Sequence, residues 1–150
     1  MVKLRQKFRH GEELDSRLRW LHQPQSVDVG VTNVERMTVG AGKGTDAWQK
    51  TYYEPEIVAD NAPVFGLDWE YDDFSAMARM RVNPVSLFDQ GGIMVKYGPA
   101  NWIKAGLEYV DGQMRLSVVA TNGFSDWTTH GYRAVSSNLT LAVHKRGTEV

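Results

Sequence analysis

The chain has 150 residues, 42% of them hydrophobic, and its 17 basic and 18 acidic side chains leave a net charge of −1. This composition is that of a folded domain with a packed core, and it excludes an intrinsically disordered chain. The balanced charge creates no global field that would attract nucleic acid or anionic lipid, so neither is expected as a partner. A chain of this length forms one domain, which we expect to span residues 1–150.

Cysteine is absent from the sequence, which excludes disulfides and Cys-based metal sites and fits a reducing compartment. Residues 1–10 are charged at alternate positions and lack the apolar stretch of a secretory signal. No apolar run reaches the roughly 18 residues of a membrane-spanning helix. We therefore expect a cytoplasmic protein with no membrane contact. The histidines have no paired spacing typical of metal ligands, so neither a metal nor another cofactor is expected.

The N-terminal segment, residues 1–13, carries cations at alternate positions, namely Lys3, Arg5, Lys7 and Arg9. Alternation of this kind is typical of the solvated face of an edge strand, and a loose tail is the alternative.

Turn-forming residues interrupt the sequence at short intervals, at residues 22–24, 40–44, 60–63, 83–84, 98–99, 111–112, 122–123 and 146–147. The glycine-rich segment 40–44 lacks the pattern of a phosphate-binding loop and is predicted to be a hairpin loop. Intervals this short accommodate strands and not a helical scaffold, and no 3.6-residue apolar period is sustained. The sequence therefore predicts an all-β sandwich or barrel.

The hairpin around Asp111-Gly112 is the best-defined element. This dipeptide favours a two-residue type I′ turn, in which both central residues have positive φ. The turn fixes the register of the flanking strands, and it predicts that one face carries the pairs Glu108–Arg115, Gly106–Ser117, Lys104–Val119 and Trp102–Thr121. The other face would carry Leu107, Ala105, Ile103, Leu116, Val118 and Ala120. Because that face is uniformly apolar, we expect it to be the core face.

A third strand, residues 92–97, is predicted to join this hairpin through the loop containing Gly98-Pro99. If Lys96 lies beside Trp102, Gly92 meets Gly106 on the polar face, and Ile93 and Val95 fall on the apolar face. Gly92, Gly106 and Ser117 then form a row of small residues across the sheet. We interpret this row as the floor of a shallow groove.

The polar face of these strands is our candidate ligand-binding groove. An aromatic face stacks on a sugar ring, and nearby charged groups hydrogen-bond to hydroxyls. The alternative is structural: Glu108 and Arg115 form an ordinary cross-strand pair and Trp102 covers a sheet edge. The candidate groove residues are Lys96, Trp102, Lys104, Gly106, Glu108, Arg115, Ser117, Thr121, Asp126 and Trp127.

The segment Ser125-Asp126-Trp127 enters this set because it follows the Asn122-Gly123 turn directly. It could bring a second tryptophan and a carboxylate to the rim of the groove. A loop closed by the Asp126 side chain, with Trp127 covering the core, is the alternative.

Further strands are predicted from alternating apolar residues. The clearest is Phe74 to Val82, with Phe74, Ala76, Ala78, Met80 and Val82 facing inward. Less regular segments that we also expect to be strands are 27–39, 48–53, 64–69 and 138–144. The sequence stops soon after the Arg146-Gly147 turn, where a returning strand would begin, so we expect the sandwich to lack its last strands.

Asp68, Glu70 and Asp72 stand at alternate positions and would share a face if they lay on a strand. Paired carboxylates about 5–9 Å apart hydrolyse glycosidic bonds, so this spacing allows a catalytic interpretation. The alternative is that Tyr71-Asp72-Asp73 forms the turn before the Phe74 strand, which would break the alignment. We expect no catalytic residues.

Several ordered blocks together resemble an uncharacterised domain family that includes the yeast protein named for regulation of enolase. The similarity covers about residues 14–150 and rests on residues 18–24, 44–53, 73–74, 89–95, 102–108, 116–121 and 125–127. It implies a concanavalin A-like jelly-roll sandwich of two antiparallel sheets, a fold whose concave sheet binds saccharides in many relatives. The chain departs from the family pattern at Gln25-Ser-Val and at the final strands.

The resemblance transfers no activity, so three functions stay open. A non-catalytic module that binds a saccharide or polar metabolite in the groove is favoured. A glycoside-active enzyme and a protein-interaction module that regulates a metabolic enzyme are the alternatives. The missing strands would leave an open sheet edge through which a homodimer could form.

Overall fold

The computed structural model describes residues 3–30, 34–132 and 138–147, and no helix occurs among them. The protein is therefore all-β in its described parts, and its sheets are antiparallel, as in a β-sandwich. Contacts divide the chain into two compact units, residues 1–47 with 59–69 and residues 48–58 with 70–150. No described helix is long and apolar enough to cross a membrane. The predictions of one domain and of a cytoplasmic location stay predictions.

The first unit contains short strands. β1 (Arg19–Trp20) pairs with β6 (Phe65–Gly66), and β2 (Ser26–Val29) pairs with β3 (Met37–Gly40). β5 (Ala59–Asp60) also belongs to this unit, and β4 (Ala47–Trp48) lies at its boundary with the second unit. Trp20 packs on Phe65, with ring centroids 4.9 Å apart. This aromatic contact stabilises the β1–β6 pair.

Several predictions for this part of the chain are wrong in detail. Residues 3–13 form no strand, and the segments predicted as strands at 48–53 and 64–69 are strand only at Trp48 and at Phe65–Gly66. The glycine-rich loop 40–44 joins β3 to β4, strands with different partners, and is no hairpin loop. Segment 27–39 forms β2 and β3 instead of one strand, and residues 31–33 lie outside the described residues.

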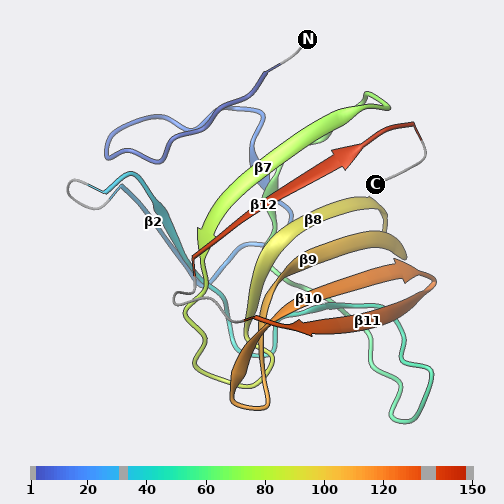
Figure 1. The fold of residues 1–150 in the computed structure, drawn as a ribbon. Coiled ribbons are helices and arrows are strands. Elements are labelled where there is room, and N and C mark those ends of the chain that lie inside the picture. The colour runs from blue at the N-terminus through green and yellow to red at the C-terminus, as the bar shows by residue number, and fades with distance from the viewer. Residues whose placement is uncertain (1–2, 31–33, 133–137, 148–150) are drawn as a thin grey trace. The chain divides into compact units, whose positions relative to one another are not determined.

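The second unit holds the longer strands: β7 (Phe74–Arg81), β8 (Gln90–Gly98), β9 (Asn101–Val110), β10 (Gln113–Asn122), β11 (Phe124–Gly131) and β12 (Asn138–Lys145). Strands β8 to β11 form one sheet in the order β11-β10-β9-β8. Strand β12 pairs with β7 in a second sheet (Figure 1). β7 and β12 contact β8, and β12 also contacts β9. β7 alternates as predicted, with its odd-numbered positions exposed.

The predicted register of the central strands is confirmed. Asp111 and Gly112 have φ of 52° and 75°, as the type I′ turn requires. All predicted pairs are present: Glu108–Arg115, Gly106–Ser117, Lys104–Val119, Trp102–Thr121, Lys96–Trp102, Val95–Ile103, Ile93–Ala105 and Gly92–Gly106. A turn and a period of two therefore determined the arrangement of three strands.

The core is distributed differently from the prediction, because buried side chains lie on both faces of the four-stranded sheet. Leu107 is fully buried on the apolar face, whereas Val119 is fully buried on the polar face. Along β10 the expected order is reversed: Ser117 and Thr121 are buried, and Val118 is 39% exposed. The second sheet contacts β8 and β9, so it covers the apolar face of the four-stranded sheet chiefly over these two strands and less over β10 and β11.

Candidate functional site

The polar face of β8 to β11 carries nine of the ten candidate groove residues. Asp126 is the exception, since it pairs with Ala120 and therefore lies on the opposite face. β11 adds Ser125, Trp127 and Thr129 to the polar face, opposite Thr121, Val119 and Ser117 of β10. The segment 125–127 is thus part of a strand and not the loop considered as the alternative, and it places Trp127, but not Asp126, on the face of the predicted groove.

Much of the predicted groove is covered. Trp102 is 3% exposed, and Glu108, Ser117 and Thr121 are each 6% exposed. Lys96, Lys104, Gly106 and Arg115 have intermediate exposure. Trp127, at 39%, is the most accessible aromatic ring of the set. A ligand that stacks on an aromatic side chain of this face would therefore meet Trp127 before Trp102.

Two hydrogen bonds to buried side chains fix the orientation of the Trp127 indole. Its Nε1–H donates to Glu108 Oε2 and to Ser117 Oγ, both at 3.0 Å. Glu108 lies on β9 and Ser117 on β10, so the two acceptors reach Trp127 on β11 from the two preceding strands. Both acceptors are buried, which makes these hydrogen bonds stronger than they would be in water. The ring consequently has a set orientation while part of its surface stays open to solvent.

Phe88 completes an aromatic pair with Trp127. The ring centroids are 6.4 Å apart with an interplanar angle of 81°, an edge-to-face geometry favoured by aromatic quadrupoles. Phe88 is 52% exposed and has φ of 68°, a conformation that is rare for a bulky residue. We refer to Phe88, Trp127, Glu108 and Ser117 as the Trp127 platform.

The loop that carries Phe88 is held by its own hydrogen bonds. Asp89 Oδ2 accepts the backbone N–H groups of Val85 and Ser86 at 2.7 and 2.8 Å. The Phe88 N–H donates to the Tyr109 carbonyl at 2.8 Å, which attaches the loop to β9. These contacts maintain the left-handed conformation of Phe88, and backbone strain of this kind occurs often at functional sites. The sequence offered no signal for Phe88, because its position depends on this loop.

Glu108 and Arg115 stand opposite each other, yet the ordinary cross-strand ion pair is not formed among the described residues. Glu108 instead accepts the Trp127 N–H. Arg115 Nε is buried and lacks a hydrogen-bond partner among the described residues.

The small residues of the predicted floor have a structural cause. A Cβ at Gly92 would lie 2.1 Å from the Ala105 carbonyl oxygen, and one at Gly106 would lie 2.1 Å from the Gly91 carbonyl oxygen. Glycine is therefore needed for the close approach of β8 and β9. This reason is independent of any ligand.

The acidic residues considered for catalysis do not form a pair on one strand. Residues 67–73 have no strand structure, so the turn interpretation is confirmed. Asp68 forms an ion pair with Arg19 at 2.5 Å within the first unit. Among the described residues no group of three His, Asp or Glu side chains is placed to hold a metal ion.

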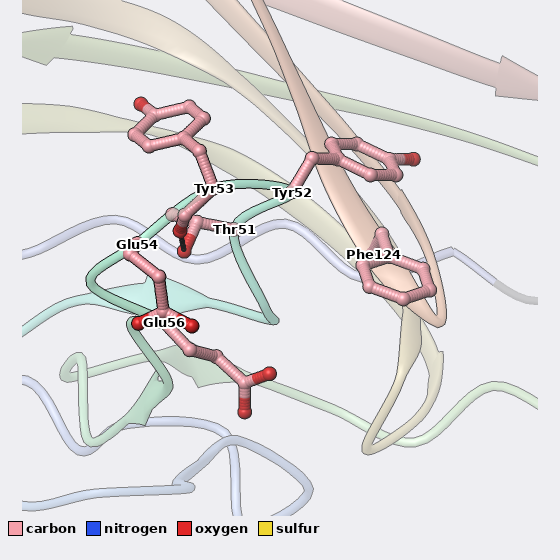
Figure 2. Close-up of a pocket in the computed structure, with 6 residues that line it drawn as sticks. All are labelled: Thr51, Tyr52, Tyr53, Glu54, Glu56 and Phe124. Carbon is pink, nitrogen blue, oxygen red and sulfur yellow. Dashed lines mark hydrogen bonds between the residues drawn. The ribbon is translucent and has the colours of Figure 1, made fainter.

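The second unit, which holds the Trp127 platform, also contains a hollow beside β11. It is lined by Thr51, Tyr52, Tyr53, Glu54, Glu56 and Phe124 (Figure 2). Ser125 N–H donates to the Gln49 carbonyl at 2.6 Å, and Gln49 N–H donates to Ser125 Oγ at 2.8 Å. These two bonds attach the start of the lining segment to β11. The sequence predicted a strand at 48–53 and a family block at 44–53, and it assigned this segment no functional role.

Two curated relatives resemble the chain in sequence. It is 36% identical over 124 residues to Regulation of enolase protein 1 of Saccharomyces cerevisiae, an alignment that covers 83% of this chain and 60% of the relative. It is 30% identical over 111 residues to an uncharacterized protein of Emericella nidulans, covering 71% and 54%. The chain thus spans little more than half the length of these relatives.

A solved structure supports the fold. The crystal structure of a functionally unknown protein from Saccharomyces cerevisiae matches with a TM-score of 0.76 and 34% identity, over 87% of this chain and 68% of that one. The model of the protein family of unknown function DUF1349 matches residues 20–150. The expected concanavalin A-like class is not named by these matches and stays a prediction. The chain belongs to the DUF1349 family, as the resemblance of its ordered blocks predicted.

Proposed function

We propose that this protein is a non-catalytic binding module that holds a saccharide or a related polar metabolite at the Trp127 platform. The observation that carries the proposal is the indole of Trp127, which is oriented by two buried acceptors and yet exposes 39% of the residue. A fixed, accessible aromatic ring stacks on the C–H face of a sugar without losing side-chain entropy on binding.

Polar groups around the ring suit the hydroxyls of such a ligand. Thr129, two residues beyond Trp127 on the same face, has intermediate exposure, and Lys104 lies in the same cross-strand row as Trp127. Arg115, which has intermediate exposure, is on this face as well. Aromatic stacking together with a few hydrogen-bonding groups is the usual composition of a site for polar small molecules.

The test is a titration with linear trisaccharides of glucose, xylose, galactose and N-acetylglucosamine, followed by NMR of the tryptophan indole N–H signals. Trp127→Phe removes one signal and thereby assigns it. We expect that signal to shift with at least one trisaccharide. Trp127→Ala should weaken binding about tenfold, since loss of a stacked ring costs roughly 1–3 kcal/mol.

Tyr97→Ala is the matched control, because Tyr97 is an exposed aromatic residue at 56% on β8, outside the platform. Its affinity should equal that of the wild type. Absence of a shift with all four sugars, or equal binding by Trp127→Ala, would rule the proposal out.

A second candidate function is supported by the 36% identity to Regulation of enolase protein 1. In this proposal the chain contacts a metabolic enzyme, and enolase is the first to be tested. Purified enolase would be assayed for activity and for binding by sedimentation with the wild type and with Lys104→Glu. If the polar face regulates enolase, the wild type should bind enolase and Lys104→Glu should not. Absence of binding together with unchanged enolase activity would contradict this second proposal.

A further inference from the structure

The hollow beside β11 combines aromatic rings with carboxylates. Its volume is about 380 Å³, within the range of small-ligand sites. Figure 2 shows the rings of Tyr52 and Phe124 together on one side and the side chains of Glu54 and Glu56 on another, with the Tyr53 ring apart from the aromatic pair. None of these residues belongs to the Trp127 platform.

The aromatic part of the hollow is open to solvent. Tyr52 and Tyr53 are each 72% exposed, and Phe124 is 39% exposed. Tyr52 and Phe124 stack with centroids 4.8 Å apart and planes inclined by 15°. The stacked Tyr52–Phe124 pair and the separate Tyr53 ring expose large apolar groups around one hollow, and such exposed groups tend to mark interaction sites.

The charge of the lining has one sign. Glu54 and Glu56 contribute two carboxylates, and the lining contains no basic residue. Aromatic faces are electron-rich as well, so both components of the hollow favour a positive ligand. The Lys50 ammonium lies 5.7 Å from the centroid of the Phe124 ring, so this ring already takes part in a cation–π contact. That lysine has φ of 48°, a conformation uncommon outside glycine.

Thr51 keeps the loop in shape. Its buried hydroxyl lies 2.9 Å from the carbonyl oxygens of Tyr53 and Pro55, and it accepts the Ile57 N–H at 3.1 Å. One side chain thus ties together three backbone positions of the segment that carries both tyrosines and both glutamates. The hollow is therefore formed before any ligand binds, which lowers the entropic cost of binding.

We propose that the hollow formed by Tyr52, Tyr53, Glu54, Glu56 and Phe124 binds an organic cation, an alkylammonium group of about the size of choline. The rings receive its methyl or methylene groups through cation–π contacts, and the two carboxylates neutralise its charge. The same chemistry is offered by a free amine and by the side chain of a lysine on another protein, and the test below separates these sources.

The experiment compares choline with 3,3-dimethylbutan-1-ol, its neutral carbon analogue of the same shape, using saturation-transfer NMR and calorimetry on the full chain. We expect choline to bind at least about tenfold more tightly than the neutral analogue. Glu54→Gln/Glu56→Gln should weaken choline about fivefold, because exposed ion pairs contribute modestly and the rings keep their share. Tyr52→Leu tests the aromatic contribution separately and should also weaken binding.

Glu70→Gln is the matched control, an exposed glutamate of the same unit outside the hollow. It should leave choline affinity unchanged, as should Trp127→Ala, which separates this site from the Trp127 platform. The capped amino acid Nα-acetyl-trimethyllysine methylamide is the second probe. Tighter binding of this probe than of choline supports a protein side chain as the source, and the reverse supports a free amine. Equal binding of choline and its neutral analogue, no binding of either cation, or equal loss with Glu70→Gln would overturn the proposal.

Discussion

The indole N–H of Trp127 donates to Glu108 Oε2 at 3.0 Å across the intervening strand β10, where Ser117 supplies a second acceptor at the same distance. This arrangement joins three strands through side chains in addition to their backbone ladders. It also predicts redundancy, because either acceptor alone can satisfy the indole.

We therefore expect Glu108→Ala and Ser117→Ala each to cost little, and the double variant to cost more than their sum, by about 1–2 kcal/mol. Urea unfolding measures the free energies, and hydrogen exchange of the assigned Trp127 indole should accelerate mainly in the double variant. In a Trp127→Phe background the excess cost should disappear. Additive costs in the wild-type background would show that the two acceptors act independently.

The close approach of β8 and β9 at Gly92 and Gly106 predicts severe effects of a single methyl group. Gly92→Ala and Gly106→Ala each place a Cβ 2.1 Å from a backbone carbonyl oxygen. Since backbone atoms cannot rotate away, we expect each variant to lose about 3 kcal/mol or more of unfolding free energy.

Gly131→Ala serves as the control for these variants, because it lies on the same face of β11 and a Cβ there meets nothing within 4 Å. Thermal unfolding followed by circular dichroism compares the three. A wild-type-like melting temperature for Gly106→Ala would contradict the close approach.

The register of β8 to β10 could be predicted because it depends on local chemistry. The Asp111-Gly112 turn sets the pairing, and an alternation of two residues propagates it to Lys96 and Gly92. The contact between Trp127 and Glu108 could not be predicted in the same way. The segment 124–131 has weak alternation, and the bond depends on how three strands stack their side chains.

Which side chains of β10 are buried depends on contacts with residues far away in the sequence. Sequence shows that Val118 is apolar and Ser117 polar, but not which face of the strand is covered. The indole of Trp127 contacts Ser117, whereas the second sheet contacts β8 and β9 and leaves Val118 partly exposed. Hydropathy alone therefore assigned the core face of β10 incorrectly.

Asp15 and Arg17 form a surface pair whose effect on acidity can be measured. The Arg17 guanidinium donates to the Asp15 carboxylate at 2.7 and 2.9 Å, and the Arg17 backbone N–H adds a bond of 3.0 Å. These hydrogen bonds lower the pKa of Asp15 from 3.8 to about 2. Because the folded pKa lies below the unfolded value, the contribution to stability is complete above about pH 4. It is lost as the pH falls through about 2.

An NMR titration of the Asp15 carboxyl carbon checks this value. Arg17→Gln should return the pKa of Asp15 toward 3.8. Arg19→Gln, which removes the partner of Asp68 instead, should leave it low. An Asp15 that titrates normally in the wild type would show that the pair does not persist in solution.

Thr51 provides a test of the loop that carries Tyr52 and Tyr53. Thr51→Val keeps the shape of the side chain but leaves the Ile57 N–H without its acceptor and removes the bond to the Tyr53 or Pro55 carbonyl. We expect a loss of about 1–3 kcal/mol and faster hydrogen exchange at Ile57. Thr128→Val, an exposed strand position, should change neither. Unchanged exchange at Ile57 in Thr51→Val would contradict this role.

The reversed burial along β10 has a consequence for protein engineering. A redesign that repacks the core by choosing apolar positions would alter Val118 and Ala120, which are exposed, and would treat Ser117 and Thr121 as freely variable surface. A saturation library of this strand should instead tolerate polar replacements at Val118 and Ala120 and reject bulky ones at Ser117 and Thr121. In β10 the residues that resist replacement are two buried hydroxyl side chains: Ser117, which accepts the Trp127 N–H, and Thr121, which hydrogen-bonds to Ser125.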